Sequence, residues 1–206
     1  TYSGDLAPAL MTLDAEVDLI GKPGNVFLGV VHRIDRPVSG VLLFARTSKA
    51  AARLCEQFRE GSIEKVYWAV TVGVPHPQNG EIRGWMIKST GPGDDKEKMR
   101  SALQSEKNSV HAITQYSVVA AAGRKAAWVA LKPETGRTHQ LRFHMAELGT
   151  QIVGDKKYTS PGELPNGLAA GLHLHARALR LPGPGGRGAP LELEAELPPH
   201  MQQTFD

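Results

Sequence analysis

The first residues that could do chemistry lie at positions 32–40, where one carboxylate stands among basic side chains. Asp35 lies between Arg33 and Arg36, and His32 precedes it by three residues. Nearby positive charge favours the ionised form of a carboxyl group. An ionised carboxylate suits a nucleophile or an electrostatic stabiliser better than a proton donor. Taken alone, the same pattern also fits a salt bridge in a loop.

A second dense group of polar residues occupies positions 134–144, with the sequence Glu-Thr-Gly-Arg-Thr-His-Gln-Leu-Arg-Phe-His. Gly136 permits a tight turn, and Thr138 is a candidate N-cap for a helix that ends at Gly149. On that helix, Arg142 shares a face with Thr138. Arginine, histidine and glutamine side chains at a helix start suit phosphate and sugar oxygens. We therefore favour a functional role over a set of surface caps and ion pairs.

An aromatic candidate lies on a predicted strand at positions 64–72. Alternation places Tyr67, Ala69 and Thr71 on one face of that strand, opposite the larger apolar residues. Small neighbours leave the tyrosine ring room to be approached, although a half-buried structural tyrosine would show the same pattern.

A metal site is the weaker interpretation of the remaining histidines. His173 and His175 share a face of a predicted strand, but no carboxylate or thiol lies at ligand spacing beside them. The single cysteine, Cys55, excludes an internal disulfide framework and a cysteine-rich zinc site, and it is typical of a reducing cytosol. The sequence therefore predicts no metal site and a structural role for both histidines.

The elements that must position these groups are strands with interspersed helices. Thr47, Ser48 and Gly61 delimit a predicted helix, and a weaker apolar pattern allows a short helix at positions 6–17. Positions 88–109 are polar and of mixed charge, which indicates a surface loop. The predicted fold class is α+β, with a mixed, mostly antiparallel central sheet and flanking helices. Apolar runs and alternation predict strands at positions 38–45, 64–72, 81–87, 110–120, 125–132, 172–181 and 191–197.

The amino-acid composition limits the classes of partner that we expect for this protein. The 206 residues suffice for one domain with a substantial core, since 41% of them are hydrophobic. The net charge is +3 and the isoelectric point is about 9.0, which is compatible with a polyanion partner where the positive charge is clustered. We see no apolar run long enough to cross a bilayer and no signal-peptide pattern, so we expect a cytoplasmic protein.

In combination, these segments resemble the signature motifs of the RluA-type pseudouridine synthases. The resemblance rests on segments in the family's order at positions 32–47, 65–69, 136–144 and 174–176, and positions 153–158 also fit. It implies the pseudouridine synthase fold as a single catalytic domain across residues 1–206, without a separate N-terminal RNA-binding domain. The strand that usually precedes the first motif is not evident, which leaves open whether it is missing.

The resemblance also implies an activity: isomerisation of uridine to pseudouridine in structured RNA (rRNA or tRNA) by a monomer, without metal or organic cofactor. Asp35 matches the catalytic aspartate, Arg142 the base that pairs with it, and Tyr67 the ring that stacks on the uracil and is a candidate proton acceptor from carbon 5. Asp35 could attack the sugar or abstract a sugar proton to give a glycal, and both routes remain open. The residues expected to bind substrate are Arg33, Arg36 (also a candidate for a plain ion pair), Arg137, His139, Gln140, Leu141 and Leu174.

Two other functions remain as alternatives. A non-catalytic RNA-binding module could keep the same fold, but it would have no use for the combination of Asp35, Tyr67 and Arg142. A phosphotransfer enzyme is suggested by the His-Arg-x-Asp pattern of a kinase catalytic loop. However, no glycine-rich phosphate loop precedes that pattern and no Asp-Phe-Gly follows it.

Overall fold

A computed structural model of the chain describes residues 27–89, 98–158, 170–183 and 189–205, and it shows the predicted α+β class. The helices are α2 (Ser48–Glu60), α3 (Gln140–Glu147) and α4 (Pro199–Phe205). The strands are β1 (Gly29–Val30), β2 (Ser39–Gly40), β3 (Phe44–Ala45), β4 (Glu64–Val72), β5 (Asn79–Lys88), β6 (Met99–Ala102), β7 (Val110–Ala122), β8 (Ala126–Pro133), β9 (Leu174–Leu181) and β10 (Leu191–Glu194).

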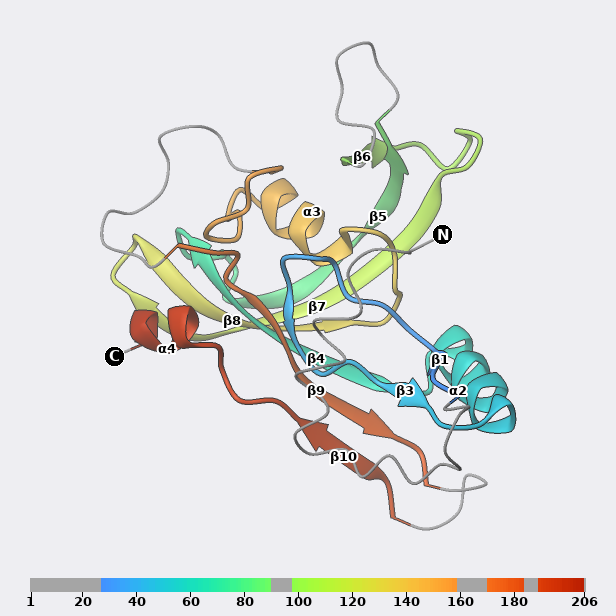
Figure 1. The fold of residues 1–206 in the computed structure, drawn as a ribbon. Helices are drawn as coiled ribbons and strands as arrows, with labels where there is room; N and C mark the ends of the chain where they lie inside the picture. The colour runs from blue at the N-terminus through green and yellow to red at the C-terminus, as the bar shows by residue number, and fades with distance from the viewer. Residues whose placement is uncertain (1–26, 90–97, 159–169, 184–188, 206) are drawn as a thin grey trace.

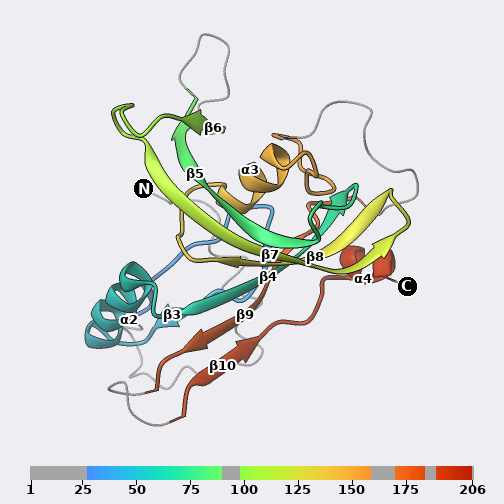
Figure 2. The ribbon, with the colours of Figure 1, turned by 180° about the vertical axis from the view of Figure 1, so that it is seen from behind.

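One mixed, mostly antiparallel sheet dominates the fold (Figure 1). Its strand order is β10-β9-β4-β8-β7-β5-β6, with neighbours antiparallel, and β2 adds to β9 in parallel. The end of the sheet that carries β5, β6 and β7 curves round α3 (Figures 1 and 2). Helix α4, which the sequence did not predict, lies at the opposite end of the molecule from α2 (Figure 2). Among the described residues, no helix is long and apolar enough to span a membrane.

The main core lies between the central strands and α3. Leu141 and Met145 of α3 are buried against strand residues such as Leu131 and Leu174. Full burial of one such side chain stabilises the fold by about 2 kcal/mol. This packing fixes α3 on the sheet, and with it the polar residues at its N-terminal end.

Helix α2 forms as its capping residues predict. The Thr47 hydroxyl accepts a hydrogen bond from the Ala50 backbone N–H at 3.1 Å, and Gly61 ends the helix in the left-handed conformation at φ 73°. Leu54 and Phe58 pack against a second cluster that contains Ile63. The helix therefore supports the loop that contains the first polar motif.

The single strand predicted at positions 38–45 is wrong. The chain there forms β2 and β3, which pair with different strands: β2 with β9 and β3 with β1. Gly40, the last residue of β2, has φ 114°, and a Cβ at this position would come within 2.2 Å of the Ala176 carbonyl oxygen. Only glycine tolerates that combination, so the chain bends here directly after the first polar motif.

Other predicted elements differ in detail. Positions 88–109 are not all loop, because Met99–Ala102 forms β6 and pairs with β5. The helix predicted at positions 6–17 lies outside the described residues. His173 bonds to Thr204 of α4 at 2.9 Å, and His175 bonds to Ser39 of β2 at 2.8 Å. Both rings thus join elements of the fold, as the structural interpretation predicts.

Candidate active site

The predicted site residues come together around one pocket of about 380 Å³ beside the N-terminal end of α3. Its walls come from the loop at positions 31–38, from α2, from β4, from the loop that leads into α3 and from the start of β9. Arg36 is the exception, since it is not among the residues that line the pocket. The predicted residues that do line it are Arg33, Asp35, Tyr67, Arg137, His139, Gln140, Leu141, Arg142 and Leu174.

The Asp35 loop is fixed at both sides of the carboxylate. The Val38 backbone N–H bonds to the Asp35 carbonyl at 2.9 Å. The His32 Nε2 accepts a hydrogen bond from the Leu43 N–H at 2.8 Å, and its ring stacks on Phe58 with ring centroids 4.5 Å apart. Burial and the charge of a nearby lysine lower the pKa of His32 to about 4, so the ring is neutral and Nε2 can accept. His32 is therefore a support of the loop.

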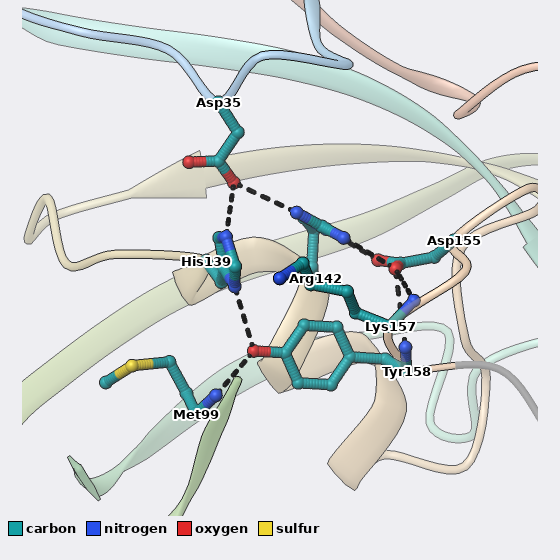
Figure 3. Close-up of polar contacts among 7 residues, drawn as sticks. All are labelled: Asp35, Met99, His139, Arg142, Asp155, Lys157 and Tyr158. Carbon is teal, nitrogen blue, oxygen red and sulfur yellow. Dashed lines mark hydrogen bonds and ion pairs between the residues drawn. The ribbon is translucent and has the colours of Figure 1, made fainter. Parts of the chain in front are cut away.

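Arg142 lies between two carboxylates (Figure 3). Its Nε and its Nη2 each lie 2.7 Å from an oxygen of Asp155, while its Nη1 lies 3.5 Å from the Asp35 Oδ2. Burial alone would lower the pKa of Arg142, but the hydrogen bonds and charge of Asp155 and the charge of Asp35 raise it. The guanidinium is thus a permanent positive charge against Asp35.

Asp155 is held by a tight turn at positions 152–158. The Asp155 carboxylate accepts hydrogen bonds from the backbone N–H groups of Lys157 and Tyr158, in addition to those from Arg142. Gly154 has φ 76°, and a Cβ on it would come within 1.8 Å of the Gly171 carbonyl oxygen. The turn can press this closely against the neighbouring chain only because that residue is glycine.

The start of α3 differs from the prediction. Thr138 is not the N-cap: His139 takes that position in the left-handed conformation, at φ 51°, and makes no side-chain capping bond. Gln140 organises the preceding loop instead. Its Oε1 accepts from the Thr135 hydroxyl at 2.7 Å and from the Arg137 N–H at 3.0 Å, and its Nε2 donates to Ile113 and Thr114.

Tyr67 lies where the pairing of β4 with β9 shifts by one residue, between Val66 and Tyr67. Such an irregularity locally re-aims a side chain. Burial and the charge of Asp35 raise the pKa of Tyr67 to about 12, so the phenol is neutral at physiological pH. Burial also lowers the pKa of Lys65, two residues before it on the same strand.

Positive charge dominates the pocket. Asp35 is the only acid among the described residues that line it, whereas Arg33, Arg59, Lys65 and Arg137 line it together with the Arg142 described above. A concave surface with one sign of charge concentrates counter-charged ligands. The pocket therefore suits a polyanion.

Sequence reasoning missed three residues of this site. Asp155 and Tyr158 lie in a segment that matched the family, but neither had been given a role. The available signal was an acid inside an otherwise basic turn. Lys65 gave a signal too, since it shares a strand face with Tyr67 by simple alternation.

Comparisons with known proteins agree on one family. The family model for RNA pseudouridylate synthase matches residues 14–147. An uncharacterized RNA pseudouridine synthase of Synechocystis is 35% identical over 190 residues, which is 91% of this chain but 55% of that protein. The dual-specificity RNA pseudouridine synthase RluA of Salmonella typhimurium is 42% identical over 154 residues, covering 75% of this chain and 67% of that protein.

Comparison of the fold with solved structures identifies the same family. The solved structure of human RNA pseudouridylate synthase domain containing 4 superposes with a TM-score of 0.71 at 32% identity, covering 86% of this chain and 74% of that one. The chain thus spans about half the length of the Synechocystis relative and most of the human domain. Motifs, fold and sequence identity together show that the chain belongs to the RNA pseudouridylate synthase family, in its RluA-type group.

Proposed function

We propose that this chain isomerises uridine to pseudouridine in structured RNA, and that Asp35 acts on the ribose of the target nucleotide. The observation that carries the proposal is the meeting of Asp35, Arg142 and Tyr67 at one basic pocket, although they come from a loop, a helix and a strand far apart in sequence. Family membership supports the reaction type.

A pocket of about 380 Å³ suits a single base that has left its stack. A flipped uracil would stack on Tyr67, with apolar side chains such as Leu141 and Leu174 beside it. The bond between the ribose C1′ and the uracil N1 then breaks. Asp35 either attacks C1′ or removes a proton from C2′ to give a glycal. On both routes the uracil turns and bonds to C1′ through C5. On the first route this bond displaces the Asp35 carboxylate from C1′, and on the second Asp35 returns the proton to C2′. The proton on C5 is then lost and N1 gains a proton, so that the product is an isomer of uridine.

Arg142 and Tyr67 have distinct roles in this scheme. Arg142 stabilises the ionised Asp35 and fixes its orientation, since its charge is permanent and its position is set by Asp155. The neutral phenol of Tyr67 favours stacking. To accept the C5 proton it must release its own, and the Asp35 carboxylate, whose charge acts on the Tyr67 pKa, is the candidate base.

The remaining predicted residues shape the pocket or bind RNA. Arg33 and Arg137 are proposed to contact phosphates, which makes affinity salt-dependent. Arg36 lies outside the pocket lining, so we assign it to the periphery, as an RNA contact or an ion pair. Gln140 fixes the wall of the pocket through its bonds to the loop that leads into α3, and His139 faces Asp35.

The test is pseudouridine mapping at nucleotide resolution after incubation of the wild-type protein with rRNA, tRNA and a broad transcript pool. We expect discrete uridines to convert, and we expect the Asp35→Asn variant to bind the same RNA without converting it. Unchanged uridine across the whole pool would contradict the proposal. Binding without conversion by the wild type would identify a non-catalytic RNA-binding module instead.

We propose further that residues 1–206 form one catalytic domain, that its substrate is rRNA or tRNA, and that it acts as a monomer in the cytoplasm. The single sheet that links residues 39–194 supports one domain, and a lone cysteine is typical of a reducing compartment. Sedimentation tests the oligomeric state. Cell fractionation tests the compartment, since a relative in Xenopus tropicalis is named as mitochondrial.

A further inference from the structure

His139 bridges Asp35 and Tyr158 (Figure 3). Its Nδ1 lies 3.2 Å from the Tyr158 hydroxyl oxygen, and its Nε2 lies 3.9 Å from the Asp35 Oδ2. Only 9% of its side chain is exposed. The Tyr158 oxygen also accepts a hydrogen bond from the Met99 backbone N–H at 2.8 Å. A continuous row of polar groups therefore runs from β6 to the Asp35 carboxylate.

The direction of the protons in this row follows from its first member. An amide N–H can only donate, so the Tyr158 oxygen accepts from Met99 and its own O–H needs another acceptor. Nδ1 of His139 is the acceptor within reach. A neutral imidazole that accepts at Nδ1 carries its proton on Nε2, and Nε2 is the atom that faces Asp35.

The charge state of both side chains is consistent with that direction. Burial is the main cause that raises the pKa of Tyr158 to about 12, so its hydroxyl keeps its proton. Burial, assisted by the charges of Arg142 and Lys157, lowers the pKa of His139 against the opposing effects of Asp35 and Asp155. His139 is thus neutral and can donate through one nitrogen only.

Two donors therefore converge on one oxygen of the carboxylate. The Arg142 Nη1 lies 3.5 Å from the Asp35 Oδ2, and the His139 Nε2 faces the same atom. We propose that His139, oriented by Tyr158, is a positioning residue that holds Oδ2 of Asp35 together with Arg142, which leaves Oδ1 as the oxygen that reacts with the ribose. This inference rests on the proposed function.

The contact between the His139 Nε2 and the Asp35 Oδ2 is longer than a hydrogen bond. At 3.9 Å, Nε2 is beyond direct hydrogen-bond reach, and contacts of catalytic groups are often long before substrate binds. The support behind His139 is firm by comparison. The Tyr158 ring packs with Met99 and Phe143, and the Arg142 guanidinium lies 5.5 Å from its centroid. Closure on substrate thus requires movement of the Asp35 side chain, between the fixed ends of its loop, rather than of His139.

The proton position can be measured without RNA by long-range ¹H–¹⁵N NMR of the imidazole rings. The His139 signals are assigned by their loss in His139→Asn, a substitution that suits the left-handed backbone at this position. We expect the Nε2–H form in the wild type and a mixture of tautomers in Tyr158→Phe. A predominant Nδ1–H form, or a charged ring at pH 7, would overturn the donor chain.

Kinetics on an RNA that the wild type converts test the role in catalysis. We expect kcat to fall about 10- to 50-fold in His139→Asn and about 5-fold in Tyr158→Phe, with KM unchanged. Tyr116→Phe is the matched control, because it removes the hydroxyl of another buried tyrosine, which bonds to the Pro77 carbonyl at 3.0 Å and is not among the residues that line the pocket. Its kcat should equal that of the wild type.

The outcomes separate this inference from the proposed function. Unchanged kcat in both variants, or a rise in KM alone, would overturn the positioning role while the activity stands. If the wild type forms no pseudouridine, the proposed function fails and the assignment of Oδ1 fails with it. Thermal melting of each variant shows whether a lost kcat reflects a lost fold.

Discussion

Arg142 contacts two carboxylates that differ in burial and in the number of hydrogen bonds they accept. The Asp155 side chain is 0% exposed and receives two hydrogen bonds of 2.7 Å from the guanidinium. The Asp35 side chain is 19% exposed and lies 3.5 Å from one nitrogen of the same group. Asp155 has its oxygens occupied by protein donors, whereas Asp35 keeps capacity for a further partner. The satisfied acid fixes the arginine, and the unsatisfied acid is available for chemistry.

The same contrast extends to the walls around each acid. Asp155 belongs to the α3 wall, where a tight turn and a buried helix leave little room for movement. Asp35 belongs to a loop fixed at its ends by His32 and Val38, with the carboxylate between them. Substitutions of the two acids should therefore have different effects: Asp155 should control stability, and Asp35 should control turnover.

The largest expected effect is on turnover in Asp35→Asn. We expect kcat to fall by at least about 1,000-fold, because the group that acts on the ribose has lost its charge. The free energy of unfolding should change by less than about 1 kcal/mol, since Arg142 keeps its partner Asp155. Single-turnover kinetics and urea denaturation measure the two quantities. A large loss of stability would show that the two acids are not distinct.

Asp155→Asn should act mainly on stability, whereas Asp35→Asn acts mainly on turnover. Removing one partner of a buried pair leaves an uncompensated charge, which costs about 3 kcal/mol of unfolding free energy. We expect kcat to fall as well, because Arg142 loses the bonds that hold it against Asp35. Denaturation midpoints test the first effect. Wild-type stability with abolished turnover would instead place Asp155 among the groups that act on the substrate.

The pH dependence of stability gives a third test of the buried wall. His144 on α3 is 2% exposed, bonds to the Thr114 hydroxyl at 2.9 Å and, because of burial, has its pKa lowered from 6.5 to about 4. Between these two values the unfolded chain binds the proton and the folded chain does not, so stability falls as the pH drops. The expected loss is about 3 kcal/mol at pH 4, and His144→Gln should remove this part of the slope in denaturation curves measured from pH 7 to 4.

The smallest of these four effects belongs to Tyr67→Phe, on the Asp35 side of the pocket. The ring that stacks on the uracil is kept, so RNA affinity should not change. Loss of the hydroxyl should slow a late proton-transfer step by about 10-fold. Burst kinetics on a converted RNA would show the slowed step. Turnover equal to that of the wild type would show that the hydroxyl is dispensable.

Much of the fold could be predicted because local patterns determine it. Helix α2 has a threonine N-cap and a glycine C-cap, and buried residues alternate along the first half of β7 and along most of β8. The prediction at positions 38–45 was wrong because partner choice is not a local property. The two halves of that apolar run pair with strands 14–16 and 136 positions away, and nothing within the run itself encodes this.

The site could be predicted as a set of residues but not as a network. The sequence motifs identified Asp35, Tyr67 and Arg142 as residues of one site, and in the structure all three line the same pocket. The role of Asp155 follows from its burial against Arg142, which no spacing rule reports. Likewise, Thr138 looked like a helix cap, but the buried amide of Gln140 satisfies the preceding loop and moves the helix start by one residue.

The pairing of β2 with β9 has a consequence for biosynthesis. Ser39 and Gly40 align with His175 and Ala176, so the residues just after the Asp35 loop are held by chain that is translated 136 codons later. Leu174, which lines the pocket, comes from that same late segment. A nascent chain that has not yet reached Ala176 therefore lacks both the clamp and one wall of the pocket. The pocket around Asp35 is therefore completed only after the ribosome has passed β9.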